Sequence, residues 1–515
     1  MVHIPIDRSK PIPLARQIQG HLERLIQERM LTPGVKLPAT RELARDLGVN
    51  RATVALAYDE LVAAGRVRAH VGQGTFVAGP MDVPGESAVD PAPAREVAAR
   101  VAVDWSGLLS RGAQIVAGDL ERRRLPALPA PPQGLISFAG GMPDSAMLPT
   151  EAFRRVLNAV VREEGQELLQ YYPVGGYPPL RRFLSMYLLR FGVEARPEEI
   201  LIVNGSQQGF DLIARTLLDP GDCVAIEQPT YPRAMQVFRS FGAQLVPVPL
   251  GDDGPRPDAL ERALERHAPK FFYCQPSAHN PTGLTMSADA RRRLLEIASR
   301  HQVAIVEDGF DGSLCYGPRP PAPLKALDRQ GLVVYIGTFS KILFPGLRLG
   351  WLVAPRAVLD RLEAAKQIAD IQTSALIQAA VYRFCERRLL ERHLARIAEE
   401  YGRRQRRLLE SLTRRVPRDV TWTDPTGGFS LLLSLPDGVD STALLGRAVA
   451  RGVSFTPGPA FFADQGGEGR LRLSFSSVPV SRIDEGVRRL ADVIRDARRR
   501  TAHRVEAERA AVPLV

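Results

Sequence analysis

Lys341 lies in a loop between hydroxyl side chains and an arginine, in the string TFSKILFPGLRLG. The loop directly follows an apolar run that ends at Ile336. A lysine amine can form a Schiff base with a carbonyl group. The hydroxyls of Thr338 and Ser340 suit a phosphate, and the planar guanidinium of Arg348 can bind the same phosphate with two donors. A lone lysine in a loop is usually solvated at the surface, but here the neighbouring hydroxyls and the arginine suit a bound phosphate.

Two other polar segments follow apolar runs and suit the same ligand. Asp308 ends the run VAIVED, and a carboxylate buried at a strand end is costly unless it meets a cation; Glu307 is the competing carboxylate. The segment Gly205-Ser206-Gln207 follows another run and opens a helix, where backbone N–H groups can bind a phosphate. Pyridoxal phosphate requires such parts: a lysine, a carboxylate that keeps the pyridine nitrogen protonated, and donors for the phosphate.

The content and order of these motifs resemble the fold-type I aminotransferases over residues 138–475. TFSKILFPGLRLGW is similar to their Schiff-base motif, with Lys341 as the lysine. VEDGFD is similar to the motif that places a carboxylate beside the pyridine nitrogen, here Asp308. The resemblance implies pyridoxal 5'-phosphate as the cofactor, bound by residues that include Ser206, Gln207 and the Thr338–Arg348 segment.

The same resemblance implies roles for further residues. Tyr231 in QPTYP would stack on the cofactor, and Asn280 in HNPTG would hydrogen-bond its phenolic oxygen. Arg472 in LRLSF would bind the α-carboxylate of an amino acid, and Gly141 in FAGGMPD would close over that carboxylate. Tyr171 in LQYYPVGGYPPLR would reach the phosphate of a neighbouring subunit, which implies a homodimer; Tyr172 is the alternative.

The chain departs from the family pattern at Phe310. The family usually carries a tyrosine two residues after the aspartate, and its hydroxyl donates to the phenolic oxygen. Phe310 has no hydroxyl, so this oxygen would keep Asn280 alone, and we expect altered electronic tuning of the cofactor. HNPTG, in contrast, keeps the asparagine that is typical of true aminotransferases.

Short apolar runs and helical stretches must position these side chains. The runs at 200–203, 223–226, 271–274, 303–306 and 332–335 are bounded by Gly and Pro and separated by helical patterns. Buried strands that alternate with helices predict an α/β domain with a mostly parallel sheet, which we place at residues 135–515. The resemblance adds a smaller C-terminal α+β subdomain.

Residues 1–79 predict a separate, smaller domain. Helical spacing runs from Pro13 to Met30, and a short second helix follows with Thr40 as its expected N-cap. A third helix begins at Asn50, and residues 68–77 read as two strands around a glycine-rich tip. The spacing of the second and third helices is that of a helix-turn-helix, whose second helix enters the major groove of DNA.

The string GVKLPATRELARDLGVNRATVALAYDELVAAGRV, followed by VGQGTFV, resembles the GntR-type winged helix-turn-helix. The resemblance implies double-stranded operator DNA as a partner, contacted by Arg41, Arg51 and Thr53 and by Gly72 and Gly74 of the wing. Whether the two arginines contact bases or phosphates stays open. A GntR-type head joined to an aminotransferase-like domain resembles the MocR subfamily of regulators.

Residues 80–134 are rich in Pro and Ala, which predicts an exposed linker. Within it, residues 89–125 carry Trp105 and some apolar periodicity, so part of the linker can form a short docked helix.

The whole-chain composition sets limits on these hypotheses. A length of 515 residues predicts at least two domains, and a net charge of +11 is compatible with a polyanionic partner. Four cysteines without CxxC spacing argue against a disulfide framework and a zinc site. No apolar run suits a membrane span or a signal peptide, so we expect a cytoplasmic protein with no membrane partner.

Two functions follow from the motifs. The first is a regulator that senses an amino acid, an amine or pyridoxal phosphate itself through a Schiff base at Lys341. The second is an aminotransferase that uses a 2-oxo acid acceptor and carries a DNA-binding head. A DNA-binding module has no use in transamination, which favours the regulator.

Overall fold

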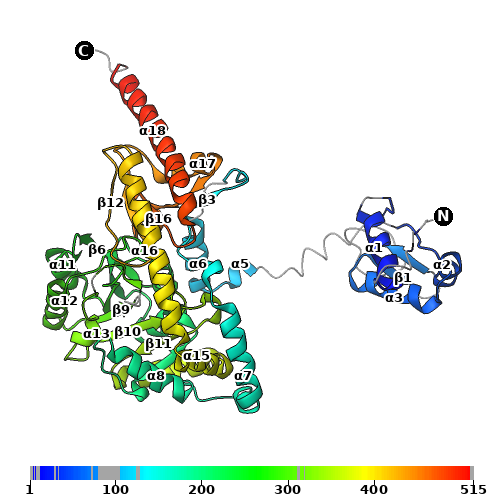
Figure 1. Cartoon of the computed structure of the whole chain (residues 1–515), viewed down its shortest axis with the longest axis horizontal. Coiled ribbons are helices and arrows are strands. Elements are labelled where there is room, and N and C mark those ends of the chain that lie inside the picture. Colours follow the sequence, from blue (N-terminus) through cyan, green and yellow to red (C-terminus); the bar gives the residue numbers. More distant parts are fainter. Residues whose placement is uncertain are drawn as a thin grey trace. The chain divides into compact units, whose positions relative to one another are not determined.

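The computed structural model describes residues 4, 6, 12–27, 30–32, 34–70, 74–78, 105–122, 128–309, 314–317 and 319–510. They fall into two compact units, within residues 1–104 and within residues 105–515, and each is described by itself (Figure 1). Across the described ranges, no helix combines the length and the apolar character that crossing a membrane requires.

The described residues of the N-terminal unit form three helices and a hairpin: α1 (Leu14–Gln27), α2 (Thr40–Leu47), α3 (Arg51–Ala63), β1 (Val67–His70) and β2 (Gly74–Val77). β1 and β2 are antiparallel, with Val67 opposite Val77. Ile18 and Leu22 of α1 are one turn apart, so they share a face and pack in one cluster with Val54 and Leu61 of α3. The predicted winged helix-turn-helix architecture is confirmed.

The turn between α2 and α3 is defined by local backbone chemistry. Gly48 ends α2 with a left-handed φ of 61°, which glycine adopts without steric cost. The side chain of Asn50 caps α3 by accepting a hydrogen bond from the N–H of Ala52 at 3.0 Å. The N-cap expected at Thr40 is wrong by one residue. Thr40 is already helical, and the extended residue before it is Ala39, whose methyl group cannot accept a hydrogen bond.

An eight-stranded sheet organises the C-terminal unit, in the order β4-β11-β10-β9-β8-β5-β6-β7. Its strands are β4 (Ile200–Val203), β5 (Cys223–Gln228), β6 (Gln244–Gly251), β7 (Gly254–Pro255), β8 (Phe271–Cys274), β9 (Ala304–Asp308), β10 (Val333–Thr338) and β11 (Gly350–Val353). The neighbours from β6 to β10 are parallel. β11 is antiparallel to both β10 and β4, so β4 runs in the same direction as the parallel strands. The expected mostly parallel sheet is confirmed.

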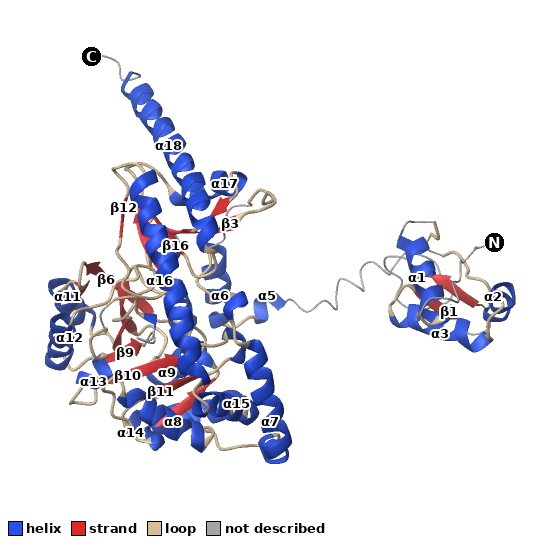
Figure 2. Ribbon diagram, in the orientation of Figure 1, coloured by secondary structure: helices blue, strands red, loops and turns tan. Residues whose placement is uncertain are grey.

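Helices cover both faces of this sheet (Figure 2). α9 (Gly205–Leu217), α10 (Pro232–Ser240) and α14 (Arg356–Asp370) pack on one face, and α11 (Pro257–His267) and α12 (Ala288–Arg300) pack on the other. On β5, Val224 and Ile226 belong to the first cluster and Ala225 to the second, because successive residues of a strand point to opposite faces. Burial on both faces explains why the central strands are apolar throughout.

A smaller region follows the sheet in the sequence. Its antiparallel sheet has the order β12-β13-β16-β15, from β12 (Thr421–Trp422), β13 (Ser430–Ser434), β15 (Thr456–Pro457) and β16 (Arg470–Ser474). β3 (Ile136–Ser137) pairs in parallel with β14 (Val453–Ser454). The yellow helix α16 runs from the large-sheet region to β12 (Figure 1). The other helices are α7 (Thr150–Leu168), α8 (Pro178–Leu189), α13 (Leu324–Leu327), α15 (Ala375–Glu386), α16 (Leu389–Arg415), α17 (Ser441–Ala450) and α18 (Val480–Ala510).

In the described part of the segment predicted as a linker, residues 105–122 and 128–134, the chain forms the helices α5 (Trp105–Leu108) and α6 (Arg111–Arg122). α6 packs against α10 of the C-terminal unit. Asp119 of α6 forms an ion pair with Arg239 of α10, with 3.0 Å between Oδ1 and Nη1. Only 7% of the Asp119 side chain and 18% of the Arg239 side chain are exposed.

Candidate functional site

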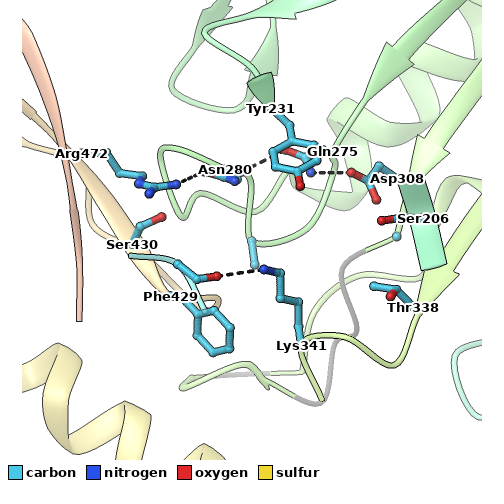
Figure 3. A pocket seen from close by; sticks show the side chains of 13 residues that line it. Ser206, Tyr231, Gln275, Asn280, Asp308, Thr338, Lys341, Phe429, Ser430 and Arg472 are labelled. Atoms are coloured by element: carbon cyan, nitrogen blue, oxygen red, sulfur yellow. Dashed lines mark hydrogen bonds between the residues drawn. The ribbon is translucent and has the colours of Figure 1, made fainter. Parts of the chain in front are cut away.

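A pocket of about 610 Å³, counted with its open mouth, lies where the carboxyl ends of the parallel strands meet. Such an edge is where open α/β sheets bind ligands. Ser206 follows β4, Tyr231 follows β5, Gln275 follows β8, Asp308 ends β9 and Thr338 ends β10. Figure 3 shows their side chains around one space. The pocket is lined by Gly141, Ser206, Tyr231, Gln275, Ala278, Asn280, Asp308, Gly309, Thr338, Lys341, Phe429, Ser430 and Arg472.

The side chain of Lys341 extends into this pocket from the loop after β10 (Figure 3). Its Nζ donates a hydrogen bond to the carbonyl oxygen of Gly141 at 2.8 Å. Burial lowers the pKa of Lys341 to about 8, and the positive charge of Arg472 acts in the same direction. A lowered pKa increases the fraction of neutral amine, which is the nucleophilic form.

Asp308 is buried at the end of β9. Burial raises its pKa to about 6, against the opposing effect of two hydrogen bonds. The hydroxyl of Tyr273 and the Nε2 of Gln275 both donate to Oδ2, at 2.9 and 2.7 Å. The competing Glu307 instead accepts two backbone N–H groups at the start of α13, at 2.9 and 2.8 Å. Of the two acids, Asp308 is therefore the one that lines the pocket.

Arg472 on β16 lies beside Asn280 at the pocket, and a hydrogen bond joins the two side chains (Figure 3). Nη1 of Arg472 donates to Oδ1 of Asn280 at 3.1 Å, and Nη2 donates to the carbonyl oxygen of Ala139 at 2.9 Å. The guanidinium carbon lies 5.0 Å from the centroid of the Phe461 ring. Burial lowers the pKa of Arg472 to about 10, so the group stays cationic at neutral pH. Its neighbour Arg470 is exposed.

The FAGGMPD loop passes directly beside Arg472. Gly141 has a φ of 125°, and a Cβ atom there would lie 3.4 Å from Nη1 of Arg472. The buried Arg404 holds the far end of the loop through its Nη2, 2.8 Å from Oδ2 of Asp144. The hydroxyl of Tyr401 accepts the N–H of Asp144 at 3.0 Å. Arg404 and Tyr401 thus tie the loop to α16, and the glycine at position 141 leaves room for the guanidinium of Arg472.

A second group of polar atoms surrounds the start of α9. Gly205 has a φ of 75°, and a Cβ atom there would lie 2.7 Å from Nη2 of Arg348. Arg348 donates to the carbonyl oxygen of Asn204 at 3.2 Å. The hydroxyls of Thr338 and Ser340 are 3.0 Å apart. This close approach of backbone, hydroxyls and guanidinium is suited to a phosphate.

Several predicted site residues lie outside the pocket lining. The side chains of Gln207 and Arg348 line a neighbouring surface hollow together with Asn204. Ser340 does not line the pocket itself, but its hydroxyl contacts that of Thr338, which does. Tyr171 is 82% exposed, whereas the ring of the alternative Tyr172 packs 5.9 Å from that of Tyr177.

Two predicted positions, Phe310 and Gly72, lie outside the described residues. The sequence motifs do not indicate Tyr273, Gln275, Phe429 or Ser430 as residues of the site. Gln275 directly follows the predicted strand 271–274, so the strand-end rule that indicated Asp308 could have indicated it too.

The N-terminal unit presents a polar surface at the start of α3. Arg51 is the first residue of α3 and is exposed, Arg41 in the first turn of α2 is also exposed, and Thr53 is half-buried. Gly74 opens β2 with a φ of 115°, and a Cβ atom there would lie 2.6 Å from Cε of Lys36. The start of the second helix of a helix-turn-helix is the part that meets base edges.

The residues of the pocket around Lys341 fit pyridoxal phosphate. The glycine cradle at Gly205 admits a phosphate, which a Cβ atom would crowd. Because Oδ1 of Asn280 accepts from Arg472, the Nδ2 of the same amide can donate to an oxygen in the pocket. Asp308 can neutralise a protonated pyridine nitrogen, and Lys341 can hold the aldehyde carbon. When bound, the cofactor supplies an electron-withdrawing ring that activates an attached amine.

The fold and the pocket define a protein that joins a winged helix-turn-helix to a fold-type I pyridoxal-phosphate-dependent domain. The chain belongs to the aminotransferase class I and II family, whose model matches residues 136–490. Residues 14–77 match the model of the bacterial regulatory proteins of the gntR family. The pairing of these two domains is that of the MocR subfamily.

Named relatives cover either the whole chain or its C-terminal unit. The probable rhizopine catabolism regulatory protein MocR of Rhizobium meliloti is 32% identical, over 94% of this chain and 94% of its own length. The aromatic-amino-acid aminotransferase 1 of Thermococcus litoralis is 39% identical, over 70% of this chain and 88% of its own. The structure of the α-aminoadipate aminotransferase LysN of Thermus thermophilus, complexed with N-(5'-phosphopyridoxyl)-L-leucine, aligns with a TM-score of 0.70 and 37% identity, over 77% of this chain and 99% of its own.

Proposed function

We propose that this protein is a transcriptional regulator that binds operator DNA and responds to an amino acid or amine joined to pyridoxal phosphate at Lys341. The observation that carries the proposal is the presence, in one chain, of a GntR-type head and of a pocket in which Lys341, Asp308 and Arg472 converge. A DNA-binding head has a use in regulation and none in amino-group transfer.

The residues predicted to bind the cofactor and the effector have separate proposed roles. Asp308 pairs with the pyridine nitrogen, Asn280 donates to the phenolic oxygen, and Tyr231 stacks on the ring. Arg472 binds the effector carboxylate beside the Gly141 turn, because it is a buried cation facing the lysine. The phosphate is held by Ser206, Thr338, Ser340 and Arg348, by the N–H of Gln207, and by Tyr171 of a second subunit.

We propose three segments: a DNA-binding domain at 1–79, a linker at 80–134 and an effector domain at 135–515. In the first, Arg41, Arg51, Thr53, Gly72 and Gly74 contact DNA. An effector can change DNA affinity only if it binds two conformations of the protein unequally. In this proposal, the contact of an effector carboxylate with Arg472 and the FAGGMPD loop supplies that difference in binding.

The proposal predicts that two substitutions separate the two activities. Arg51→Ala should weaken operator binding by about tenfold or more, because it removes an exposed arginine at the start of the helix expected in the major groove, with the visible cofactor band unchanged. Lys341→Ala should abolish that band and make DNA binding insensitive to added amino acids and amines. DNA affinity is measured by fluorescence anisotropy on operator DNA, and the band by absorption spectroscopy of the full chain.

Arg470→Ala is the matched control for loss of an arginine, because Arg470 is exposed and lies outside the pocket lining. The regulator hypothesis is wrong if Lys341→Ala keeps an effector-dependent change in DNA affinity. The DNA-binding assignment is wrong if Arg51→Ala binds the operator as tightly as the native chain does.

A second candidate function is amino-group transfer to a 2-oxo acid. It is supported by Arg472 beside Asn280 at the pocket, because the contacts proposed for an effector are also those that an amino-acid substrate would use. Its test is the release of a 2-oxo acid from a panel of amino acids, with a second 2-oxo acid as acceptor. Repeated turnover supports this candidate, and a spectral shift without released 2-oxo acid supports the regulator alone.

A further inference from the structure

Gln275 joins the two polar ends of the pocket. Its side chain is only 8% exposed and lies between Asp308 and Asn280 (Figure 3). Nε2 donates to Oδ2 of Asp308 at 2.7 Å, and Oε1 accepts the backbone N–H of Asn280 at 3.2 Å. One amide therefore contacts the side chain of Asp308 and the backbone of Asn280, the two residues expected to meet the cofactor ring.

The backbone determines which way this amide faces. A backbone N–H can only donate, so the atom of Gln275 that meets Asn280 must be the oxygen. The NH₂ group is then directed at Asp308 and can only donate to it. The orientation of the Gln275 amide thus requires an acceptor at Oδ2 of Asp308, which an ionised carboxylate provides.

The same hydrogen bonds leave one carboxylate oxygen of Asp308, Oδ1, for a ligand in the pocket. Tyr273 donates to Oδ2 at 2.9 Å, so both donors described for this carboxylate use the same atom. Oδ1 is left to accept a proton donor from the pocket. Two donors on Oδ2 also fix the rotation of the carboxylate, so the direction of Oδ1 is preset before any ligand arrives.

Glu227, which contacts the backbone of Gln275, does not add a second negative charge beside Asp308. The backbone N–H of Gln275 donates to Oε2 of Glu227 at 2.8 Å. Burial raises the pKa of Glu227 to about 8, with the charge of Asp308 adding to the effect, so Glu227 is protonated at pH 7. Asp308 therefore carries the negative charge of this cluster.

We propose that Gln275 is a positioning residue for the cofactor. It holds Asp308 ionised with Oδ1 facing the pyridine nitrogen, and it ties that carboxylate to the Asn280 loop that faces the phenolic oxygen. The inference rests on the proposed function, because it requires pyridoxal phosphate at Lys341.

Gln275→Met tests the proposal, because methionine has a similar length and no strong hydrogen-bonding group. Loss of a hydrogen bond to a charged group should raise the dissociation constant of pyridoxal phosphate about tenfold. The pH midpoint of the visible cofactor band should also move upward. A positive pyridine nitrogen withdraws electrons from the lysine-bound nitrogen, so weakening that charge lets this nitrogen keep its proton to higher pH.

Two further variants separate positioning from packing. Gln275→His restores an N–H donor of similar reach and should bring the pH midpoint back toward that of the native chain. Tyr273→Phe removes the other Oδ2 donor and leaves the Asn280 contact, so it should shift the midpoint in the same direction as Gln275→Met. Gln330→Leu, at an exposed site, is the control for losing a glutamine amide.

The readouts are equilibrium dialysis with pyridoxal phosphate and a pH titration of the absorption spectrum, both on the full chain. An unchanged dissociation constant and midpoint in Gln275→Met, with a normal band in the native chain, would overturn the role of Gln275 and leave Lys341 in place. Equal losses in Gln275→Met and Gln275→His would also overturn it, because packing would then explain them. Absence of any band in the native chain would contradict the proposed function as well.

Discussion

Glu227 and His279 form a buried pair below the pocket in which neither member is charged at neutral pH. Nε2 of His279 lies 3.4 Å from Oε2 of Glu227, and its Nδ1 lies 2.8 Å from Oγ1 of Thr282. Burial lowers the pKa of His279 to about 3 and raises that of Glu227 to about 8. Moving an ion pair out of water is expensive, so the protonated acid beside a neutral imidazole is the favoured state.

This pair predicts a pH-dependent stability that Glu227→Gln should remove. The pKa of Glu227 is about 8 in the folded chain against an ordinary 4.5, so between these values the folded state holds a proton that the unfolded state has lost. The protonated Glu227 therefore contributes its full stabilisation of the folded chain below about pH 4.5. This stabilisation is lost as the pH rises through 8. Glutamine cannot titrate, so the variant should gain stability relative to the native chain between pH 5 and 9, by a few kcal/mol.

The measurement is the thermal unfolding midpoint of both chains at pH 5, 7 and 9. Asp437→Asn, at an exposed acid, controls for the change of net charge. Parallel pH profiles for Glu227→Gln and the native chain would contradict a protonated Glu227.

At the scale of single elements, α6 is coupled to the helix that begins at the pocket. α10 starts directly after Tyr231, and its Arg239 holds Asp119 of α6 at 3.0 Å. Arg239 also donates to the carbonyl oxygen of Ala463, whose N–H donates to Gln228 at the end of β5 at 3.0 Å. The end of the linker segment is thus attached to elements that line or border the pocket.

We expect Asp119→Ala to release α6, because it leaves Arg239 without its carboxylate in a largely buried position. Breaking such a pair typically costs about 3–5 kcal/mol, and here the cost falls first on the short helix that supplies the aspartate. Amide hydrogen exchange across residues 111–122 of the full chain should accelerate in the variant.

The matched control is Asp211→Ala, whose ion pair with Arg215 at 3.2 Å has both side chains more than one-third exposed. Exposed pairs contribute little, so exchange in α6 should stay at its native rate in this variant. Equal exchange rates for α6 in Asp119→Ala and in the native chain would show that the ion pair does not hold the helix.

The strands and the strand-end residues could be predicted because their signals are local. Apolar runs marked β4, β5, β8, β9 and β10, and Asp308 was indicated by its position after one of them. The bond from Gln275 to Asp308 could not be predicted in this way, since it depends on β8 lying beside β9, and the order of strands in a sheet is a non-local property.

Contacts between distant segments limited the prediction elsewhere too. Apolar periodicity in residues 89–125 indicated a short docked helix. It could not show that α6 docks on α10, because the ion pair between them joins residues 120 positions apart in the sequence. The error at Thr40 is of another kind. Threonine is a favoured N-cap residue, yet the helix begins one residue earlier than that preference suggested, after an alanine with no capping group.

At the scale of the whole molecule, the proposed role of Tyr171 requires a second copy of the chain. Its side chain is 82% exposed and lies outside the pocket lining of its own chain. A hydroxyl that reaches the phosphate of a neighbouring subunit would make each site a composite of two chains. Two-fold symmetric dimers, the commonest oligomers, would then carry two such sites.

A shared site predicts complementation between two defective chains. Lys341→Ala removes the visible band, and Tyr171→Phe should weaken cofactor retention. In a mixed dimer, the Tyr171→Phe chain keeps its own Lys341. The Lys341→Ala chain supplies an intact Tyr171 to that site, so this one site of the dimer is restored. Random mixing of equal amounts should therefore restore about one quarter of the native sites, because half of the dimers are mixed and each regains one site.

The restored fraction is measured as visible absorbance after dialysis of a co-refolded or co-expressed mixture. Tyr172→Phe in place of Tyr171→Phe is the matched control, since the Tyr172 ring packs against Tyr177 within its own chain. Recovery with Tyr171→Phe alone assigns the shared hydroxyl to Tyr171, and recovery with Tyr172→Phe alone transfers that role to its neighbour. If neither mixture exceeds the sum of its separate parents, the site is built from one chain, and the homodimer proposal loses its chemical basis.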